Sequence, residues 1–130
     1  MAKHNEIGTI GEGIAREFLE SKGYFIKDKN YRRKYGEIDI VALDSKRVWC
    51  FIEVKSVSHE MGERGVPYET YRPEENVHPQ KVKRLLRVIE EYLVSHEIDG
   101  EWQFDVLAVH LDTEKRTAKV RHLRDIILGS

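Results

Sequence analysis

The sequence has one cysteine, Cys50, so no disulfide can form within the chain. This favours a reducing compartment and a buried, hydrophobic role for Cys50, and it predicts a cytoplasmic protein. A lone cysteine excludes a cysteine-based zinc site, and the six histidines lack the spacing of a histidine-based one. No apolar run is long enough to span a membrane, and the charged N-terminal residues are not typical of a signal peptide.

Other absences narrow the class of function. No glycine-rich loop precedes a predicted helix, so binding of nucleoside triphosphates is not indicated. The net charge of −1 does not by itself indicate a nucleic-acid-binding protein. There are no internal repeats. With 130 residues and 40% hydrophobic content, the chain is expected to form one domain, residues 1–130, around a single core.

The most informative stretch is a predicted β-hairpin within Gly36–Lys55. Apolar and other residues alternate in Glu37–Leu43 and again in Val48–Val54, with a polar turn between them. If the turn is centred near Lys46, antiparallel pairing places Asp39 opposite Glu53, because both are seven residues from it.

The residues around this pair suggest a cation site. Lys55 shares the face of Glu53, since residues two apart on a strand point the same way. Facing carboxylates repel each other, and a bound divalent cation is the usual way to make them compatible. A lesser candidate, Glu37, shares the face of Asp39; its alternative is a surface or salt-bridge role.

The remaining elements follow from periodicity and capping signals. Ser58–His78 has no clear period and is expected to be a long loop, either a lid over the site or disordered. The other predicted elements are a helix Ile7–Lys22 capped by Gly23, a strand Tyr24–Tyr31, a helix starting at Pro79 with Val82, Leu85, Leu86, Ile89 and Leu93 in the core, strands Phe104–His110 and Ala118–His122, and a short helix His122–Leu128.

Two basic segments flank the hairpin in this arrangement. Such clusters are either solvated surface or contacts to a nucleic-acid backbone, and interleaved tyrosines such as Tyr31 and Tyr35 suit base stacking. The candidate nucleic-acid-binding residues are Arg32, Arg33, Lys34, Lys81, Lys83 and Arg84.

Asp39 followed by Glu53-Val54-Lys55 resembles the signature of the PD-(D/E)XK nuclease superfamily, which has the restriction-endonuclease-like fold. Longer motifs resemble the YraN-like family of small bacterial proteins, which is grouped with the Holliday-junction-resolvase-like nucleases. The resemblance runs from about Gly8 to Val109. Its motifs are Gly8-x-x-Gly11-Glu12-x-x-Ala15, Gly23-Tyr24, Asn30-Tyr31-Arg32, Gly36-Glu37-Ile38-Asp39 and Glu53-Val54-Lys55.

This resemblance implies an α/β fold with an α-β-β-β-α-β core, in which helices flank a mixed central sheet. It implies Mg²⁺- or Mn²⁺-dependent hydrolysis of phosphodiester bonds in nucleic acid, with DNA the expected substrate. Asp39 and Glu53 would be metal ligands and catalytic residues, with Lys55 as a catalytic cation. The resemblance also implies a metal-binding and catalytic carboxylate at Glu12, which the sequence alone favours as the end of a capping box, Thr9–Glu12.

Two other interpretations stay open. The chain could be a non-catalytic nucleic-acid-binding or partner-docking module on a nuclease-like fold. Alternatively, Lys55 could only pair with Glu53 or Asp39 as a structural salt bridge. The sequence leaves a protein partner, a homodimer, and the choice between DNA and RNA undecided.

Overall fold

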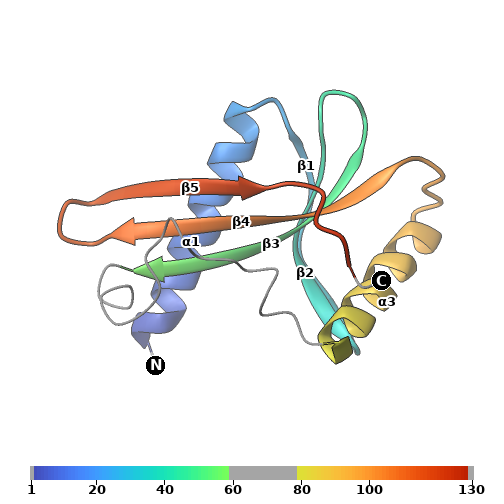
Figure 1. Cartoon of the computed structure of the whole chain (residues 1–130), viewed down its shortest axis with the longest axis horizontal. Coiled ribbons are helices and arrows are strands. Elements are labelled where there is room, and N and C mark those ends of the chain that lie inside the picture. Colours follow the sequence, from blue (N-terminus) through green and yellow to red (C-terminus); the bar gives the residue numbers. More distant parts are fainter. Residues whose placement is uncertain (1, 59–78, 129–130) are drawn as a thin grey trace.

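The computed structural model describes residues 2–58 and 79–128, with side chains from Glu6 onward (Figure 1). The predicted helices and strands are present with shifted ends, except for the predicted C-terminal helix. In chain order they are α1 (Ala2–Ser21), β1 (Phe25–Arg33), β2 (Gly36–Leu43), β3 (Trp49–Ser58), α3 (Pro79–Ser95), β4 (Trp102–Asp112) and β5 (Thr117–Leu123).

The strands form one five-stranded sheet in the order β1-β2-β3-β4-β5. Strands β1, β2 and β3 are consecutive antiparallel neighbours, as the sequence predicts. Strand β4 then pairs parallel with β3, and β5 pairs antiparallel with β4. The protein is therefore an α/β protein with a mixed sheet, consistent with a nuclease-like core.

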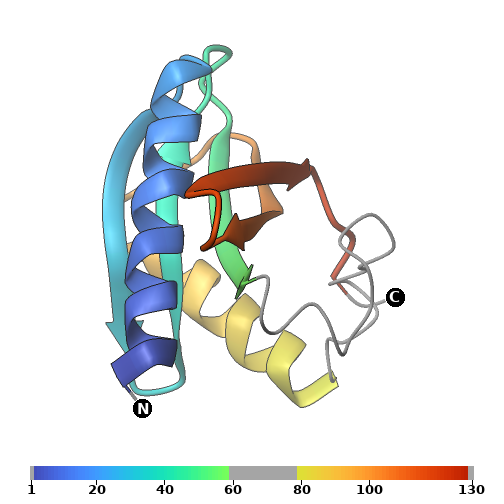
Figure 2. The same ribbon diagram turned by 90° about the vertical axis from the view of Figure 1, so that its left-hand side faces the viewer.

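The helices lie on opposite faces of this sheet (Figures 1 and 2). Helix α1 packs Ala15 and Leu19 against residues of the sheet such as Ile52. Helix α3 packs its apolar face against the other side. Leu85 and Ile89 of α3 are buried as predicted, and Val88 and Tyr92 join them in the core. Each sheet face therefore has its own apolar layer.

Helix α1 runs close to β3 and ends where the sequence predicts. A Cβ atom added to Gly11 would lie 1.8 Å from Ser56 Oγ, so only glycine allows this approach. At the C-terminal end, Gly23 has a φ of 90°, and Tyr24 N–H donates to the Leu19 carbonyl over 3.0 Å. These bonds form a Schellman cap.

The capping-box interpretation of Thr9–Glu12 is wrong. Helix α1 begins at Ala2, so Thr9 lies about two turns inside it and has no free N-terminal amide to cap. Glu12 is consequently a mid-helix residue.

The predicted helix His122–Leu128 is also wrong. Strand β5 continues through Leu123, and the residues from Arg124 to Leu128 contain no helix. Ile126 N–H donates to the Phe104 carbonyl over 2.7 Å, and Asp125 N–H donates to Asp105 Oδ1 over 2.8 Å. Bonds to β4 thus replace the i to i−4 bonds of a helix.

The predicted loop Ser58–His78 is shorter at its start than expected, because β3 includes Ser58. Residues 59–78 lie outside the described part of the chain, so the expectation of a lid or disorder falls there. No helix in the described ranges combines the length and the apolar character needed to cross a membrane.

Candidate functional site

The β2–β3 hairpin brings Asp39 and Glu53 to the same place. The backbone register runs from Leu43 opposite Trp49 to Ile40 opposite Ile52, so its continuation places Asp39 opposite Glu53. Beyond Ile52, Val54 N–H donates to the Asp39 carboxylate oxygen Oδ2 over 2.8 Å. The Asp39 side chain thus links β2 to β3 just beyond the last backbone pair of the two strands, Ile40 and Ile52.

These residues line a pocket of about 420 Å³ on the α3 side of the sheet. Its size lies within the range of roughly 300–1,000 Å³ that is usual for small-molecule sites. Both polar and apolar groups contribute, from β2, β3, α3 and the β1–β2 turn. The lining residues are Tyr35, Gly36, Glu37, Asp39, Glu53, Val54, Lys55, Lys81, Arg84 and Leu85.

Two lysines contact the Glu53 carboxylate. Its Oε2 atom lies 3.2 Å from Lys55 Nζ and 3.3 Å from Lys81 Nζ. Lys55 comes from the same strand, whereas Lys81 comes from the first turn of α3. A single carboxylate oxygen of Glu53 therefore links the hairpin to helix α3.

Asp39 is electrostatically different from Glu53. The pKa of Asp39 is raised to about 6. Burial is the largest cause, the negative charges of Glu12, Glu53 and Glu37 add to it, and the Val54 N–H bond opposes it. Its ionised form is thus less favourable in the folded protein than in water. A cation near Asp39 would stabilise that form.

Glu12 is not among the residues that line the pocket. It lies on α1 and contributes to the pKa of Asp39 only as a nearby negative charge. Across the described ranges, no three His, Cys, Asp or Glu side chains are grouped closely enough to hold a metal ion. Glu12 as a third metal ligand stays a prediction.

The basic candidates on β1 and in the β1–β2 turn lie outside the pocket lining. The Arg32 side chain lies 2.8 Å from Glu37 in an exposed ion pair. The Arg33 guanidinium lies 4.1 Å from the centre of the Tyr31 ring and 3.5 Å from Glu91. Lys34 is exposed in the turn.

On α3, the structure brings Lys81 and Arg84 into the pocket, whereas Lys83 is exposed outside its lining. Tyr35 also lines the pocket, and its ring stacks on the Arg87 guanidinium at 3.5 Å. The sequence suggests a base-stacking role for Tyr35 beside the basic residues, but not its contact with α3, because the approach of α3 cannot be read from local periodicity.

Sequence reasoning also missed a buried aspartate, Asp105, on the opposite face of the sheet. Its side chain is 0% exposed and contacts His122. The available signal was an acidic residue inside the apolar run of the predicted strand Phe104–His110, where an unpaired charge would be costly.

Residues 11–109 match the family described as "Uncharacterised protein family UPF0102". A UPF0102 protein of Flavobacterium psychrophilum is 34% identical over 125 residues, which is 96% of each chain. One of Alkaliphilus oremlandii is 38% identical over 125 residues, or 94% of this chain and 97% of the relative. A UPF0102 protein of Bacteroides thetaiotaomicron is 36% identical over 109 residues, or 84% of this chain and 83% of the relative.

Proposed function

Since this chain belongs to the UPF0102 family, as its resemblance to the YraN-like proteins predicts, and that family's description names no activity, we propose a function from the site itself. The proposed function is divalent-cation-dependent hydrolysis of phosphodiester bonds in nucleic acid, with DNA as the first substrate to test. One observation carries this proposal: Asp39, Glu53 and Lys55 line a single pocket that basic residues of α3 also enter.

The carboxylates fit a hard divalent cation. Asp39 has a raised pKa and lies in the field of neighbouring carboxylates, so its ionised form would gain from a nearby cation. Asp39 and Glu53 would hold Mg²⁺ or Mn²⁺, with water and substrate oxygens completing the coordination that Mg²⁺ prefers. When bound, such an ion lowers the pKa of a coordinated water and offsets charge on a phosphoryl group.

The protein's own cations have separate tasks in this proposal. Lys55 shares the pocket with both carboxylates and would stabilise negative charge that develops on the phosphate oxygens. Lys81 and Arg84 enter from α3 and would position the substrate phosphates. The Val54 N–H bond holds the Asp39 carboxylate in orientation.

A second candidate has an observation of its own. The Glu53 carboxylate already has two ammonium partners, Lys55 and Lys81, which is the arrangement of a structural ion-pair cluster. Such a cluster would link α3 to β3 in a module that binds nucleic acid or a protein partner without cleaving.

The deciding experiment incubates purified protein with labelled linear, single-stranded and branched DNA and with matched RNA. Each substrate is tested with Mg²⁺, with Mn²⁺ and with chelator. We expect cleavage that chelator abolishes and that Asp39→Asn reduces to background. Lys115→Gln serves as the control, because it removes an exposed charge in the β4–β5 turn, outside the pocket lining and away from the basic segments. Binding without cleavage across the whole panel would favour the binding module.

A further inference from the structure

A second pocket, of about 410 Å³, lies on the α1 side of the sheet. Its walls come from the C-terminal end of α1, the β2–β3 turn and the end of β5, segments far apart in the sequence. The lining residues are Phe18, Lys22, Tyr24, Asp44, Ser45, Lys46, His122 and Arg124. None of them lines the pocket that contains Asp39.

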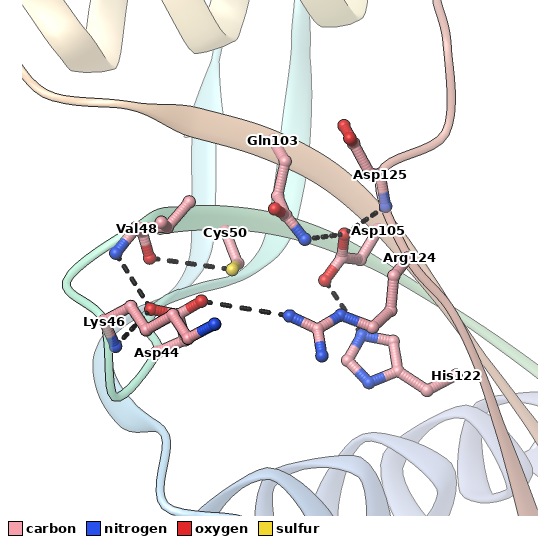
Figure 3. Close-up of polar contacts among 9 residues, drawn as sticks. All are labelled: Asp44, Lys46, Val48, Cys50, Gln103, Asp105, His122, Arg124 and Asp125. Atoms are coloured by element: carbon pink, nitrogen blue, oxygen red, sulfur yellow. Dashed lines mark hydrogen bonds and ion pairs between the residues drawn. The ribbon is translucent and has the colours of Figure 1, made fainter.

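His122, which lines this second pocket, is hydrogen-bonded to the buried Asp105 (Figure 3). His122 Nε2 lies 2.8 Å from Asp105 Oδ2, and their side chains are only 13% and 0% exposed. Burial raises the pKa of Asp105, but bonds from His122, from the Asp125 N–H and from Gln103 outweigh burial and leave the pKa lowered. Because an ionised carboxylate only accepts, His122 Nε2 carries a hydrogen and donates it to Asp105.

The pocket carries an excess of positive charge. Three basic side chains, those of Lys22, Lys46 and Arg124, line it, whereas Asp44 is the only carboxylate among the lining residues that the structure describes. Asp44 Oδ1 already accepts bonds from the Lys46 and Val48 N–H groups, over 2.8 and 2.9 Å. Arg124 lies 3.9 Å from Asp44 Oδ2, too far for a hydrogen bond. The guanidinium is therefore held near the pocket without being fully paired to Asp44.

The pocket is also larger than a phosphate group needs, and part of its wall is aromatic. The rings of Phe18 and Tyr24 lie against the His122 imidazole, with centroids 6.2 and 6.0 Å away. Burial raises the pKa of Tyr24, although Arg124 opposes this, so its hydroxyl keeps its proton and can donate. Cations beside aromatic rings suit a ligand that joins a phosphate to a flat ring.

We propose that this pocket binds a phosphomonoester carried on a nucleoside-sized group, with Lys22, Lys46 and Arg124 contacting the phosphate. The same chemistry is present in a free mononucleotide and in the phosphorylated end of a nucleic-acid strand. The site is independent of the Asp39 pocket and does not require that the protein cleave nucleic acid.

Titration calorimetry with adenosine 5′-monophosphate, adenosine and inorganic phosphate tests this proposal. We expect the monophosphate to bind at least about tenfold more tightly than either of the other two. Lys22→Gln and Arg124→Gln should each weaken binding by about tenfold, the usual cost of losing a hydrogen bond to a charged group. Lys115→Gln, an exposed charge in the β4–β5 turn, should bind as wild type does.

Two further measurements distinguish a free nucleotide from a strand end as the ligand, and this pocket from the Asp39 pocket as the binding site. A short single strand with a 5′-phosphate, compared with its 5′-hydroxyl counterpart, tests whether a strand end or only the free nucleotide binds. Asp39→Asn should leave binding of the monophosphate unchanged, so a failure of the nuclease proposal does not affect this result. Equal binding of adenosine and its monophosphate, wild-type affinity in both Gln variants, or no binding by any phosphorylated probe would overturn the proposal.

Discussion

Asp39 and Asp105 are both largely or fully buried, yet their surroundings differ in kind. Asp39 accepts one backbone bond, from Val54, and lies in the field of Glu12, Glu37 and Glu53. Asp105 accepts bonds from His122, Gln103 and the Asp125 N–H. Burial acts on both carboxyls, but only Asp105 has enough donors to reverse its effect.

The contrast separates a carboxylate that has several hydrogen-bond donors within the protein from one that the proposed function assigns to a metal ion. Asp105 ties β4 to β5 and to the segment after it, and its pKa is lowered. Asp39 has a pKa of about 6 and opens onto a pocket. Perturbed carboxyls of the second kind are concentrated at functional sites.

The largest expected effect is on stability when Asp105 is removed. Asp105→Ala leaves three donors, on His122, Gln103 and the Asp125 N–H, without their acceptor. We expect a loss of about 3–5 kcal/mol in the free energy of unfolding, measured by urea denaturation, because each buried donor left without a partner costs about 1–3 kcal/mol. The matched variant on the other face, Asp39→Ala, should cost much less. Similar losses in the two variants would remove the distinction between the two aspartates.

The next effect is kinetic and belongs to the Asp39 pocket. Lys55→Met keeps much of the side-chain length and its apolar stem, so packing should survive. If Lys55 acts on charge that develops only in the transition state, cleavage should fall by about 10²-fold while substrate binding changes by a few fold. Single-turnover rates and binding isotherms measure the two quantities. A structural salt bridge to Glu53 predicts instead that stability falls and that residual activity follows the folded fraction.

The two aspartates should also differ in the sign of their pH dependence. The pKa of Asp39 is raised in the folded state, so its contribution to stability is present below about pH 4 and is lost as the pH rises to about 6. Asp39→Asn should therefore stabilise the protein by about 1–2 kcal/mol at pH 7.5 in buffer with chelator, as measured by urea denaturation.

Asp105 should behave in the opposite way. Its folded-state pKa is lowered, so its contribution is present above about pH 4 and is lost at lower pH. Asp39→Asn should keep this loss of stability at low pH. If the free energy of unfolding of Asp39→Asn varies with pH between about 4 and 7 as that of wild type does, the pKa of Asp39 is not raised in the folded protein.

The smallest effect concerns nucleic-acid binding and sharpens the roles of the arginines. Arg84 lines the carboxylate pocket, whereas Arg32 lies outside it in an ion pair with Glu37. Arg84→Gln should reduce the slope of log affinity against log salt by about one, the value for one lost phosphate contact. Arg32→Gln should reduce it less, since Glu37 already offsets part of the charge. Equal slopes for wild type and both variants would remove these arginines from the interface.

Local sequence was sufficient for much of the fold. The hairpin register follows from alternation around a polar turn: β2 and β3 pair as far as Ile40 opposite Ile52, and Asp39 and Glu53 beyond this pair line the same pocket. Gly23 and Pro79 mark helix ends because a positive φ and a missing N–H act locally. The same locality explains one failure: Arg124–Leu128 is not helical, because Ile126 and Asp125 bond to β4 instead.

The sequence by itself therefore determined most of the helices and strands, the α/β class, the family motifs and the β2–β3 hairpin that carries Asp39 and Glu53. Only the tertiary structure decided that Lys81 reaches Glu53 from 28 residues away, that burial raises the pKa of Asp39, and that His122 bonds to Asp105. The physical reason is range. Alternation, caps and turns depend on neighbours in the chain, whereas burial and electrostatic interactions depend on whichever segments the fold brings together.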